Sequence, residues 1–307
     1  MKLESELAEL RGQLGQLHAS LARIDDAQRA MLDSQADIAT RVRRTQALTA
    51  RTYESLAGWP ELLAAARAAE DYELAFEDTD PLVSIPIPTY HSPDTLCERA
   101  LASVRAQTHT RWEAIVVGDH CVDDTAARVA ALGDERIRFI NLPVRENDPE
   151  DPWERWAVKG SVPRSAGIAE ARGRWIAPLS HDDAWDPNHL ELLLGAARAH
   201  RAEVAYSRMR ISPDGRTIGA FPPRLGDFGW QAAIFHGGLR FLRYDRNCAL
   251  ASEPNDWNLA RRAWEAGVRF HHLAAETVTL FVAEGMEEIA AAQRERGLPP
   301  SASAGHA

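Results

Sequence analysis

The feature that most restricts the fold of this chain is an alternation of short apolar runs with stretches of helical periodicity between residues 81 and 283. Three of the runs have the length and composition of strands: residues 83–87, 114–117 and 137–142. Two stretches between them have the period of helices: residues 94–107 and 123–132. This alternation predicts an α/β fold with a mostly parallel sheet covered by helices. Ligands bind beyond the carboxyl ends of the strands in such sheets, so the residues that follow each strand are site candidates.

The first 50 residues have a different period, with apolar side chains alternately four and three residues apart. These side chains form two seven-residue registers: Leu7, Leu14, Leu21 and Val42, and Leu3, Leu10, Leu17, Ile24, Met31 and Ile38. A period of about 3.5 residues keeps one stripe facing a partner helix. We therefore expect residues 3–48 to form a coiled coil that joins copies of the chain into a homo-oligomer. The alternative is a long amphipathic helix that lies on its own domain, and the residues of the stripe do not fix the number of strands in a coiled coil.

Breaks in these patterns divide the chain. Gly58, Trp59 and Pro60 interrupt one helical pattern, and an acidic stretch that ends at Pro81 closes the next. We expect four segments: a coiled-coil oligomerisation helix over residues 1–50, a helical linker over 51–80, a catalytic domain over 81–285, and a helix end with a disordered tail over 286–307.

Composition excludes several classes of function. The 45 acidic and 35 basic residues give a formal net charge of −10, which opposes binding to nucleic acid. Cys97, Cys121 and Cys248 are widely spaced and include no Cys-x-x-Cys pair, which favours a reducing compartment and argues against a zinc site. No apolar run approaches the roughly 20 residues that cross a bilayer. We expect a cytoplasmic protein, with peripheral contact at the inner membrane face left open.

Candidate ligand-binding residues follow the first two strands. Pro88, Thr89 and Tyr90 come directly after residues 83–87, and Asp119 comes two residues after the second strand. A carboxylate at a strand end can accept hydrogen bonds from a nucleotide base or from ribose hydroxyl groups. Since Asp119 stands where crevices form in open parallel sheets, we expect it to bind a ligand.

A third cluster, Ser-His-Asp-Asp over residues 180–183, follows the apolar run 173–179. Two adjacent carboxylates repel each other. A divalent cation that bridges diphosphate oxygens would offset this repulsion and stabilise a leaving group. This arrangement favours metal or donor binding by Asp182. The alternative is that Asp183 or Asp186 caps the helix expected to begin near Pro187.

Taken together, these segments resemble the family 2 glycosyltransferases of GT-A fold, over about two thirds of the chain. The segments that carry the resemblance are residues 83–90, 116–124, 164–173 and 179–183. The resemblance implies a Rossmann-like nucleotide-diphospho-sugar transferase sheet preceded by the N-terminal helix. It also implies an inverting, hexosyltransferase-like enzyme that moves a sugar from a nucleotide-diphosphate donor to a hydroxyl of a glycan, lipid-linked or protein acceptor, in surface polysaccharide or glycan synthesis.

The resemblance assigns donor-binding roles to residues near the strand ends. Pro88, Thr89 and Tyr90 are similar to the loop that packs on the nucleotide base, and Asp119 is similar to the carboxylate that hydrogen-bonds it. Arg164 matches a basic residue near the donor site. Asp182 corresponds to the last Asp of the family's Asp-x-Asp motif, which binds Mn²⁺ or Mg²⁺ and the donor diphosphate. Since Ser180 replaces the first Asp of that motif, a strong dependence on metal is in doubt.

The resemblance also suggests a general base. Residues 253–259 resemble the family's Glu-Asp-Trp-Asp-Leu segment, which places Asp256 where a carboxylate removes the proton of the acceptor hydroxyl. Asn255 stands where a Glu is usual. The alternative for Asp256 is that it caps the helix that follows.

Four further residues are candidates for the site. His271 could bind the metal or diphosphate, although such histidines also satisfy structural hydrogen bonds. Trp153 and Trp156 lie in a polar segment and could stack on acceptor sugar rings, or could anchor that segment to the domain. His236 precedes two glycines that would allow a close approach of an acceptor, or would form an ordinary turn.

Two other classes of function remain to be weighed. Because Ser180 and Asn255 both replace acidic residues of the family pattern, the alternative is a catalytically degenerate sugar-nucleotide-binding or scaffold protein that is assembled through the coiled coil. A nucleotidyltransferase is disfavoured, since no Gly-rich, Lys-bearing loop follows the first strand.

Overall fold

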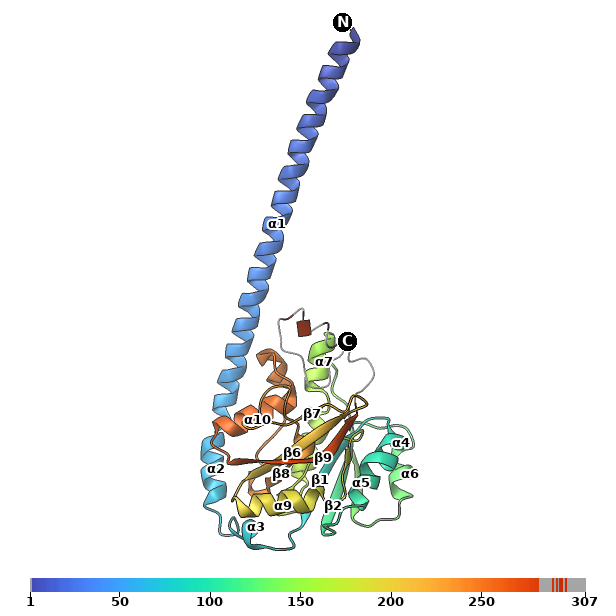
Figure 1. Cartoon of the computed structure of the whole chain (residues 1–307), viewed down its shortest axis with the longest axis vertical. Coiled ribbons are helices and arrows are strands. Elements are labelled where there is room, and N and C mark those ends of the chain that lie inside the picture. Colours follow the sequence, from blue (N-terminus) through green and yellow to red (C-terminus); the bar gives the residue numbers. More distant parts are fainter. Residues whose placement is uncertain (1, 282–288, 290, 292, 295, 297–307) are drawn as a thin grey trace.

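A computed structural model describes residues 2–281 together with residues 289, 291, 293, 294 and 296. One central sheet carries helices on both faces, and one long helix projects from the resulting domain (Figure 1). Most of the segment 286–307, expected to be a helix end and a disordered tail, lies outside the described residues.

The predicted parallel sheet is confirmed in the first half of the domain. The strands are β1 (Val83–Thr89), β2 (Trp112–Gly118), β3 (Ile137–Asn141), β4 (Trp175–Ile176), β5 (Ala184–Trp185), β6 (Val204–Ser212), β7 (Thr217–Ile218), β8 (Ala233–His236) and β9 (Phe270–Phe281). Over the described residues their order is β3-β2-β1-β4-β8-β6-β9-β5, with β7 paired to β6. Strands β3, β2, β1 and β4 are parallel, whereas β8 runs antiparallel to both β4 and β6. The mixed half of the sheet also contains the parallel pair β6 and β9.

Helices follow the strands as the alternating pattern predicts. The α-helices are α1 (Lys2–Leu56), α2 (Trp59–Arg67), α3 (Leu74–Glu77), α4 (Pro93–Thr95), α5 (Ala102–Arg105), α6 (Thr125–Ala130), α7 (Pro152–Val158), α8 (Ser161–Ala169), α9 (His189–Ala199) and α10 (Asn255–Glu265). A π-helical stretch, η1 (Leu96–Leu101), joins α4 to α5, and the short 3₁₀ turns are η2 (Trp230–Ala232), η3 (Gly237–Leu239) and η4 (Arg246–Ala251).

The two faces of the sheet build two hydrophobic clusters. Along β2, Ala114 and Val116 pack into a cluster with α5, α6 and α9, whereas Ile115 and Val117 pack into a cluster with α2, α8 and α10. This alternation follows from the two-residue period of a strand. Both faces are covered, so β2 is buried throughout and is mostly apolar. Its charged residue, Glu113, is buried and accepts hydrogen bonds from Ser84 and Arg172.

The segment between α1 and β1 contributes to both clusters. Gly58 adopts a positive φ of 62° before α2, which agrees with the predicted break at this glycine. Trp59 and Leu63 of α2 are buried against the α8 and α10 face, and Tyr72 and Phe76 are buried on the opposite face. Residues 51–80, expected to be a linker, therefore include a part of the folded core.

A buried carboxylate ties α2 to the sheet. The two oxygens of Glu203, which lies next to β6, each accept a hydrogen bond from Arg67 at 2.7 Å. Tyr72 Oη donates to the same carboxylate at 2.5 Å, and the backbone N–H of Arg269 donates to it at 2.8 Å. Burial raises the pKa of Glu203, but the hydrogen bonds from Arg67 and Tyr72 outweigh it and leave the pKa below its ordinary value.

We expect Arg67→Met to lower the free energy of unfolding by about 3 kcal/mol at pH 7, because it leaves a buried carboxylate without its main counter-charge. Since the folded-state pKa of Glu203 is depressed, the stabilisation is present above the unfolded pKa of about 4.3 and is lost as the pH falls below it. Urea unfolding of both proteins at several pH values measures the difference. Arg105→Met is the control: it removes an exposed guanidinium, and its partner Asp134 keeps its bonds to Arg136, so stability should change little. Equal stability of Arg67→Met and the parent protein would contradict the prediction.

Helix α1 extends away from the domain (Figure 1). Its 55 residues make it about 80 Å long. The predicted apolar stripe is exposed along this length: Leu10, Leu17, Ile24 and Met31 are each about 60% exposed. The alternative, in which the helix lies along its own domain, therefore does not hold, and burial begins only at Ala50. In the part of the chain that the structure describes, no helix combines the length and the apolar character needed to cross a membrane.

Candidate active site

A cavity of about 620 Å³ opens at the carboxyl ends of β1 and β2 and beside the segment that follows β4. Its volume lies in the range of sites that bind ligands of nucleotide-sugar size. Five residues selected from the sequence share its lining although they come from distant parts of the chain: Thr89, Asp119, Arg164, Asp182 and Asp256. The fold therefore brings the carboxylates of three separate motifs into one space.

The register of the parallel strands positions Asp119. Thr89 lies opposite Gly118, and the next backbone N–H, that of Asp119, donates to Thr89 O at 2.9 Å. Gly118 must lack a side chain, because a Cβ atom there would lie 2.6 Å from Asn141 Oδ1. That amide holds the turn after β2, since it accepts from Cys121 N at 2.8 Å and donates to Cys121 O at 2.7 Å. Asp119 therefore lies in a turn whose backbone is fixed by hydrogen bonds to β1 and to Asn141.

Thr89 has a buried hydroxyl group that finds no hydrogen-bond partner among the described residues. Most buried polar atoms in folded proteins are hydrogen-bonded, so an unpaired hydroxyl at the wall of a cavity is available to a ligand. Pro88 and Tyr90 line the same part of the cavity, and the ring of Tyr90 is partly exposed. This end of the cavity offers a ring to stack on and two polar groups to bond a nucleoside.

Arg145 occupies the space between these groups, although the sequence patterns do not indicate it. Its Nε donates to Asp119 Oδ2 at 3.1 Å, and its NH2 group donates to Asp148 at 2.7 Å. Its guanidinium carbon lies 4.1 Å from the ring centroid of Tyr90. Arg145 follows β3 in an irregular segment where spacing carries no signal, so only its charge within an acidic stretch could have drawn attention to it.

The adjacent carboxylates of Asp182 and Asp183 have different surroundings. Asp183 is buried, and its Oδ1 accepts from the backbone N–H of Phe281 at 3.1 Å. Burial, together with the negative charge of Asp182, raises the pKa of Asp183 above its ordinary value. Both residues line the cavity, but Asp182 is only half-buried, and its backbone oxygen is the atom that accepts a hydrogen bond from Arg99, at 2.7 Å. Asp182 is therefore the more accessible carboxylate of this pair.

Two positive charges face this end of the cavity. Arg164 lies in the first turns of α8 and donates to Lys159 O at 2.6 Å. Its charge acts to lower the pKa of both Asp183 and Asp256, so the guanidinium lies within electrostatic reach of the two carboxylates. Lys159 also lines the cavity and acts electrostatically on His181, whose pKa is lowered chiefly by burial. The sequence patterns do not indicate Lys159, which precedes α8 in a turn.

Asp256 lies in the first turn of α10, where Pro254 is the N-cap residue. Its Oδ1 accepts from the backbone N–H of Trp257 at 2.7 Å, so the carboxylate also supports the helix terminus. Burial raises the pKa of Asp256, and the bond from Trp257 and the charge of Arg164 oppose this without cancelling it. A carboxylate with a raised pKa at a cavity wall is suited to accept a proton.

The residues of the cavity can hold a divalent cation only with help from a ligand. The described residues contain no group of three or more His, Cys, Asp or Glu side chains placed to hold a metal ion. Asp182 and Ser180 both line the cavity and offer one carboxylate and one hydroxyl. Mg²⁺ is commonly held by one or two carboxylates together with substrate phosphates and water. This donor set therefore fits a cation that arrives with a diphosphate, and does not fit a metal site made of protein alone.

The structure does not bring the two candidate histidines to the cavity. His271 lies within β9, where its ring stacks on that of His200 with centroids 3.7 Å apart. His236 ends β8 and is buried in the core, where Nε2 lies 3.0 Å from the backbone oxygen of Tyr72 and Nδ1 accepts from Gly238 N. Neither histidine lines the cavity. The pairing of β9 with β6 fixes the position of His271, and packing in the core fixes that of His236.

The two candidate tryptophans lie on the same helix, α7, but their rings have different surroundings. The polar segment that carries them contains this helix, and Asp151 caps it by accepting a hydrogen bond from Glu154 N at 2.9 Å. Trp156 lines the cavity, whereas Trp153 is buried and anchors α7 to the domain. Only Trp156 is therefore placed to contact a bound sugar.

Comparisons with known proteins agree with this arrangement. A family model described as "Glycosyl transferase family 2" matches residues 84–149 and 158–248, just over half of the chain. The succinoglycan biosynthesis protein ExoO of Rhizobium meliloti (strain 1021) is 38% identical over 145 residues, which is 47% of this chain and 38% of that protein. The UDP-Glc:alpha-D-GlcNAc-diphosphoundecaprenol beta-1,3-glucosyltransferase WfgD of Escherichia coli is 28% identical over 142 residues, which is 46% of this chain and 51% of that protein. The chain thus spans about half or less of the length of these relatives.

Solved structures share the fold. S. aureus TarS 1-349 in complex with UDP-GlcNAc superposes with a TM-score of 0.52 at 17% identity, over 70% of this chain and 64% of that one. The mannosyltransferase PcManGT from Pyrobaculum calidifontis, in complex with GDP-Man and Mn²⁺, gives a TM-score of 0.52 at 13% identity, over 83% and 72% of the two chains.

Proposed function

Because the chain belongs to the family 2 glycosyltransferases, we propose that it transfers a sugar from a nucleotide-diphosphate donor to a hydroxyl group of an acceptor, with inversion at the anomeric carbon. The observation that carries this proposal is the single cavity lined by Asp119, Asp182 and Asp256. The names of ExoO and WfgD support a polysaccharide or a lipid-linked precursor as the acceptor.

In the proposed complex the nucleotide occupies the end of the cavity near β1 and β2. The base stacks on Tyr90, and Thr89 and Asp119 bond the nucleoside through an unpaired hydroxyl and a carboxylate. The diphosphate lies toward Asp182, where Arg164 and Lys159 offset its charge. A divalent cation bound with the donor would be held by Asp182 and would stabilise negative charge on the leaving diphosphate.

Asp256 is proposed to be the general base. The acceptor hydroxyl oxygen forms a bond to the anomeric carbon while the bond from that carbon to the diphosphate oxygen breaks. The hydroxyl proton passes to the Asp256 carboxylate, and the nucleoside diphosphate leaves with the bonding electron pair. The raised pKa of Asp256 makes it a stronger proton acceptor than an ordinary aspartate.

A panel of nucleotide sugars tests this proposal. The full chain is incubated with each donor, Mn²⁺ and candidate acceptors, and release of nucleoside diphosphate is followed together with donor binding. We expect one donor to bind and turn over. Binding without turnover would instead identify a degenerate sugar-nucleotide-binding protein, in keeping with Ser180 and Asn255, and absence of binding to every donor would contradict both.

The exposed stripe of α1 supports a second part of the proposal, an oligomer formed by pairing of α1 with the same helix of another copy. The spacing of the stripe, about 3.5 residues, is matched by a second helix of the same sequence. Leaving Leu10, Leu17 and Ile24 in water costs roughly 1.5–3 kcal/mol of burial energy for each side chain.

Removing residues 1–47 is expected to convert the oligomer to a monomer, because it deletes the stripe and retains the part of α1 that contacts the domain. Sedimentation equilibrium of both chains measures the number of copies per particle. Leu17→Asp within the stripe should weaken association of the full chain, whereas Ala19→Asp, two residues away on the opposite face, should not. The same number of copies in the full and shortened chains would rule out the coiled coil.

A further inference from the structure

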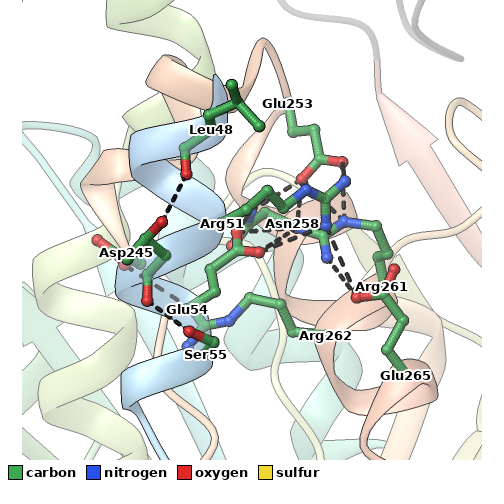
Figure 2. Close-up of polar contacts among 11 residues, drawn as sticks. Leu48, Arg51, Glu54, Ser55, Asp245, Glu253, Asn258, Arg261, Arg262 and Glu265 are labelled. Carbon is green, nitrogen blue, oxygen red and sulfur yellow. Dashed lines mark hydrogen bonds and ion pairs between the residues drawn. The ribbon is translucent and has the colours of Figure 1, made fainter. Parts of the chain in front are cut away.

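The last turns of α1 are joined to α10 by a cluster of buried charges, which we call the α1–α10 cluster (Figure 2). Its members are Glu54 of α1, Glu253 before α10, and Asn258, Arg261 and Glu265 of α10. We infer that Glu54 and Arg261 are positioning residues for Asp256, so that the base of the long helix is a working part of the active site. This inference rests on the proposed role of Asp256.

Arg261 is the centre of the cluster. Its NH2 group donates to both oxygens of Glu54, at 2.8 and 3.0 Å. Its Nε and NH2 groups donate to Glu253 Oε1 and Oε2, both at 2.8 Å, and its NH1 group donates to Glu265 Oε2 at 2.7 Å. One guanidinium therefore bonds a carboxylate from α1, one from the loop before α10 and one from α10 itself. Fork-shaped pairing of this kind fixes direction as well as distance.

The centre of the cluster is buried, although Glu265 at its edge is 57% exposed, and its charges depend on one another. Arg261 and Glu253 are each 8% exposed and Asn258 is 1% exposed. Asn258 Nδ2 donates to Glu54 and to Glu253 at 2.8 Å each, so the amide bridges the two carboxylates. Arg51 also faces these carboxylates, at 3.4 Å from Glu54 and 3.5 Å from Glu253, but its side chain is 44% exposed. Without Arg261 the carboxylates would therefore be poorly neutralised in a largely buried place. Removing one member of such a set leaves buried donors or charges without a partner, and we expect α1 and α10 to shift in response.

The cluster surrounds the turn that holds Asp256. Glu253 precedes Asp256 by three residues, and Asn258 follows it by two. On the other side, Asn255 Nδ2 donates to Lys159 O at 2.9 Å and to Ser161 Oγ at 2.8 Å, which ties the same turn to the start of α8. The first turn of α10 is thus held between α8 and α1. Figure 2 shows that Glu54 reaches this turn from the side of α1.

This arrangement explains why a helix that projects into solvent ends in so many buried polar contacts. A general base must keep its oxygen within hydrogen-bond reach of the acceptor hydroxyl, and small displacements slow the reaction steeply. When Glu54 is absent, Asn258 and Arg261 each lose a partner on α1, and the longer ion pairs of Arg51 with Glu253 and Glu265, at 3.5 and 3.6 Å, remain. The carboxylate of Asp256 then samples positions from which proton transfer is slower.

The test is Glu54→Ala in the full chain, with Asp37→Ala as the matched control. Asp37 is an exposed acidic residue of the same helix, and its side chain pairs with Arg41. We expect Glu54→Ala to lower kcat about 10- to 100-fold, to leave the donor KM within about twofold of the parent value, and to speed amide hydrogen exchange over residues 253–261. Glu54→Gln, which keeps an acceptor for Asn258 and Arg261, should restore part of kcat. Asp37→Ala should match the parent protein in all of these measurements.

Two results would overturn the inference. One is a Glu54→Ala protein with the kcat and exchange rates of the parent. The other is a loss of kcat accompanied by an equal loss of folded protein, measured by thermal unfolding at the assay temperature. Asp256→Asn, assayed in parallel, separates this inference from the proposed function. If Asp256→Asn keeps full transfer activity, Asp256 is not the general base, and both the proposed mechanism and this inference are refuted. If Asp256→Asn loses activity while Glu54→Ala does not, the role of Asp256 is supported and the positioning role of Glu54 is refuted.

Discussion

Asp256→Asn is expected to lower kcat for sugar transfer about 10²- to 10⁴-fold, which is the range that general bases contribute. The amide has the shape of the carboxylate and can still accept the hydrogen bond from Trp257 N, so the first turn of α10 should persist. It cannot take up the acceptor proton. Donor affinity, measured by calorimetry, should therefore stay within about twofold of the parent value.

The pH dependence of the reaction gives this prediction a second measurement. The base must be deprotonated, so kcat/KM of the parent enzyme rises with pH through the pKa of Asp256. Since burial raises that pKa, the rise should lie above pH 4, where an ordinary aspartate titrates at about 3.9. The rise should be absent from any residual activity of Asp256→Asn. Asp94→Asn, at an exposed pair with Arg128, is the control and should keep the parent profile. An unchanged kcat in Asp256→Asn would refute the assignment.

Asp182→Asn is expected to lower kcat/KM for the donor about 10²- to 10³-fold, the loss seen when one preorganised electrostatic contact is removed from an active site. Asp182 is the carboxylate open to the diphosphate end of the cavity, and Ser180 offers only a hydroxyl there. The activity of the parent enzyme should rise with added Mn²⁺, and the Mn²⁺ concentration needed for half of that effect should be higher in Asp182→Asn.

Asp183, the next residue in the chain, is the control for Asp182 because the same substitution can be made there. Asp183→Asn keeps an oxygen for the Phe281 N–H, and burial, which raises the pKa of Asp183, disfavours a negative charge at this place. We expect Asp183→Asn to retain most of the donor kcat/KM. Equal losses in the two variants would show that the pair acts through the fold of the loop and not through contact of Asp182 with the donor.

The sequence predicts the parallel half of the fold because each element there has a strong local signal. Strand β1 and strand β2 are mostly apolar, with Ser84 and Glu113 as polar residues near their starts, and the helices that follow them have clear periods. The other half is not readable in this way. Strand β8 has four residues, and β9 contains His271 and other polar residues, so their pairing depends on neighbours distant in the sequence.

The same distinction applies to the site. Asp119, Asp182 and Asp256 could be selected because each follows or begins a recognisable element, and the fold brings such positions to one edge of the sheet. Arg145 and Lys159 could not be selected, because the segments that carry them are irregular and are shaped by contacts with other elements. His236 was a candidate on account of its glycines, but aromatic packing and two hydrogen bonds hold its ring in the core.

The contact between Arg145 and Asp119 bears on which ligands the proposed site would select. The Asp119 carboxylate is paired with Arg145 at 3.1 Å, and the guanidinium covers Tyr90. A nucleoside can compensate for the lost ion pair and ring contact by bonding the carboxylate and stacking on the ring. Inorganic diphosphate and sugar phosphates have no base to offer in exchange, so discrimination against these abundant metabolites would begin at the far end of the cavity from the reacting carbon.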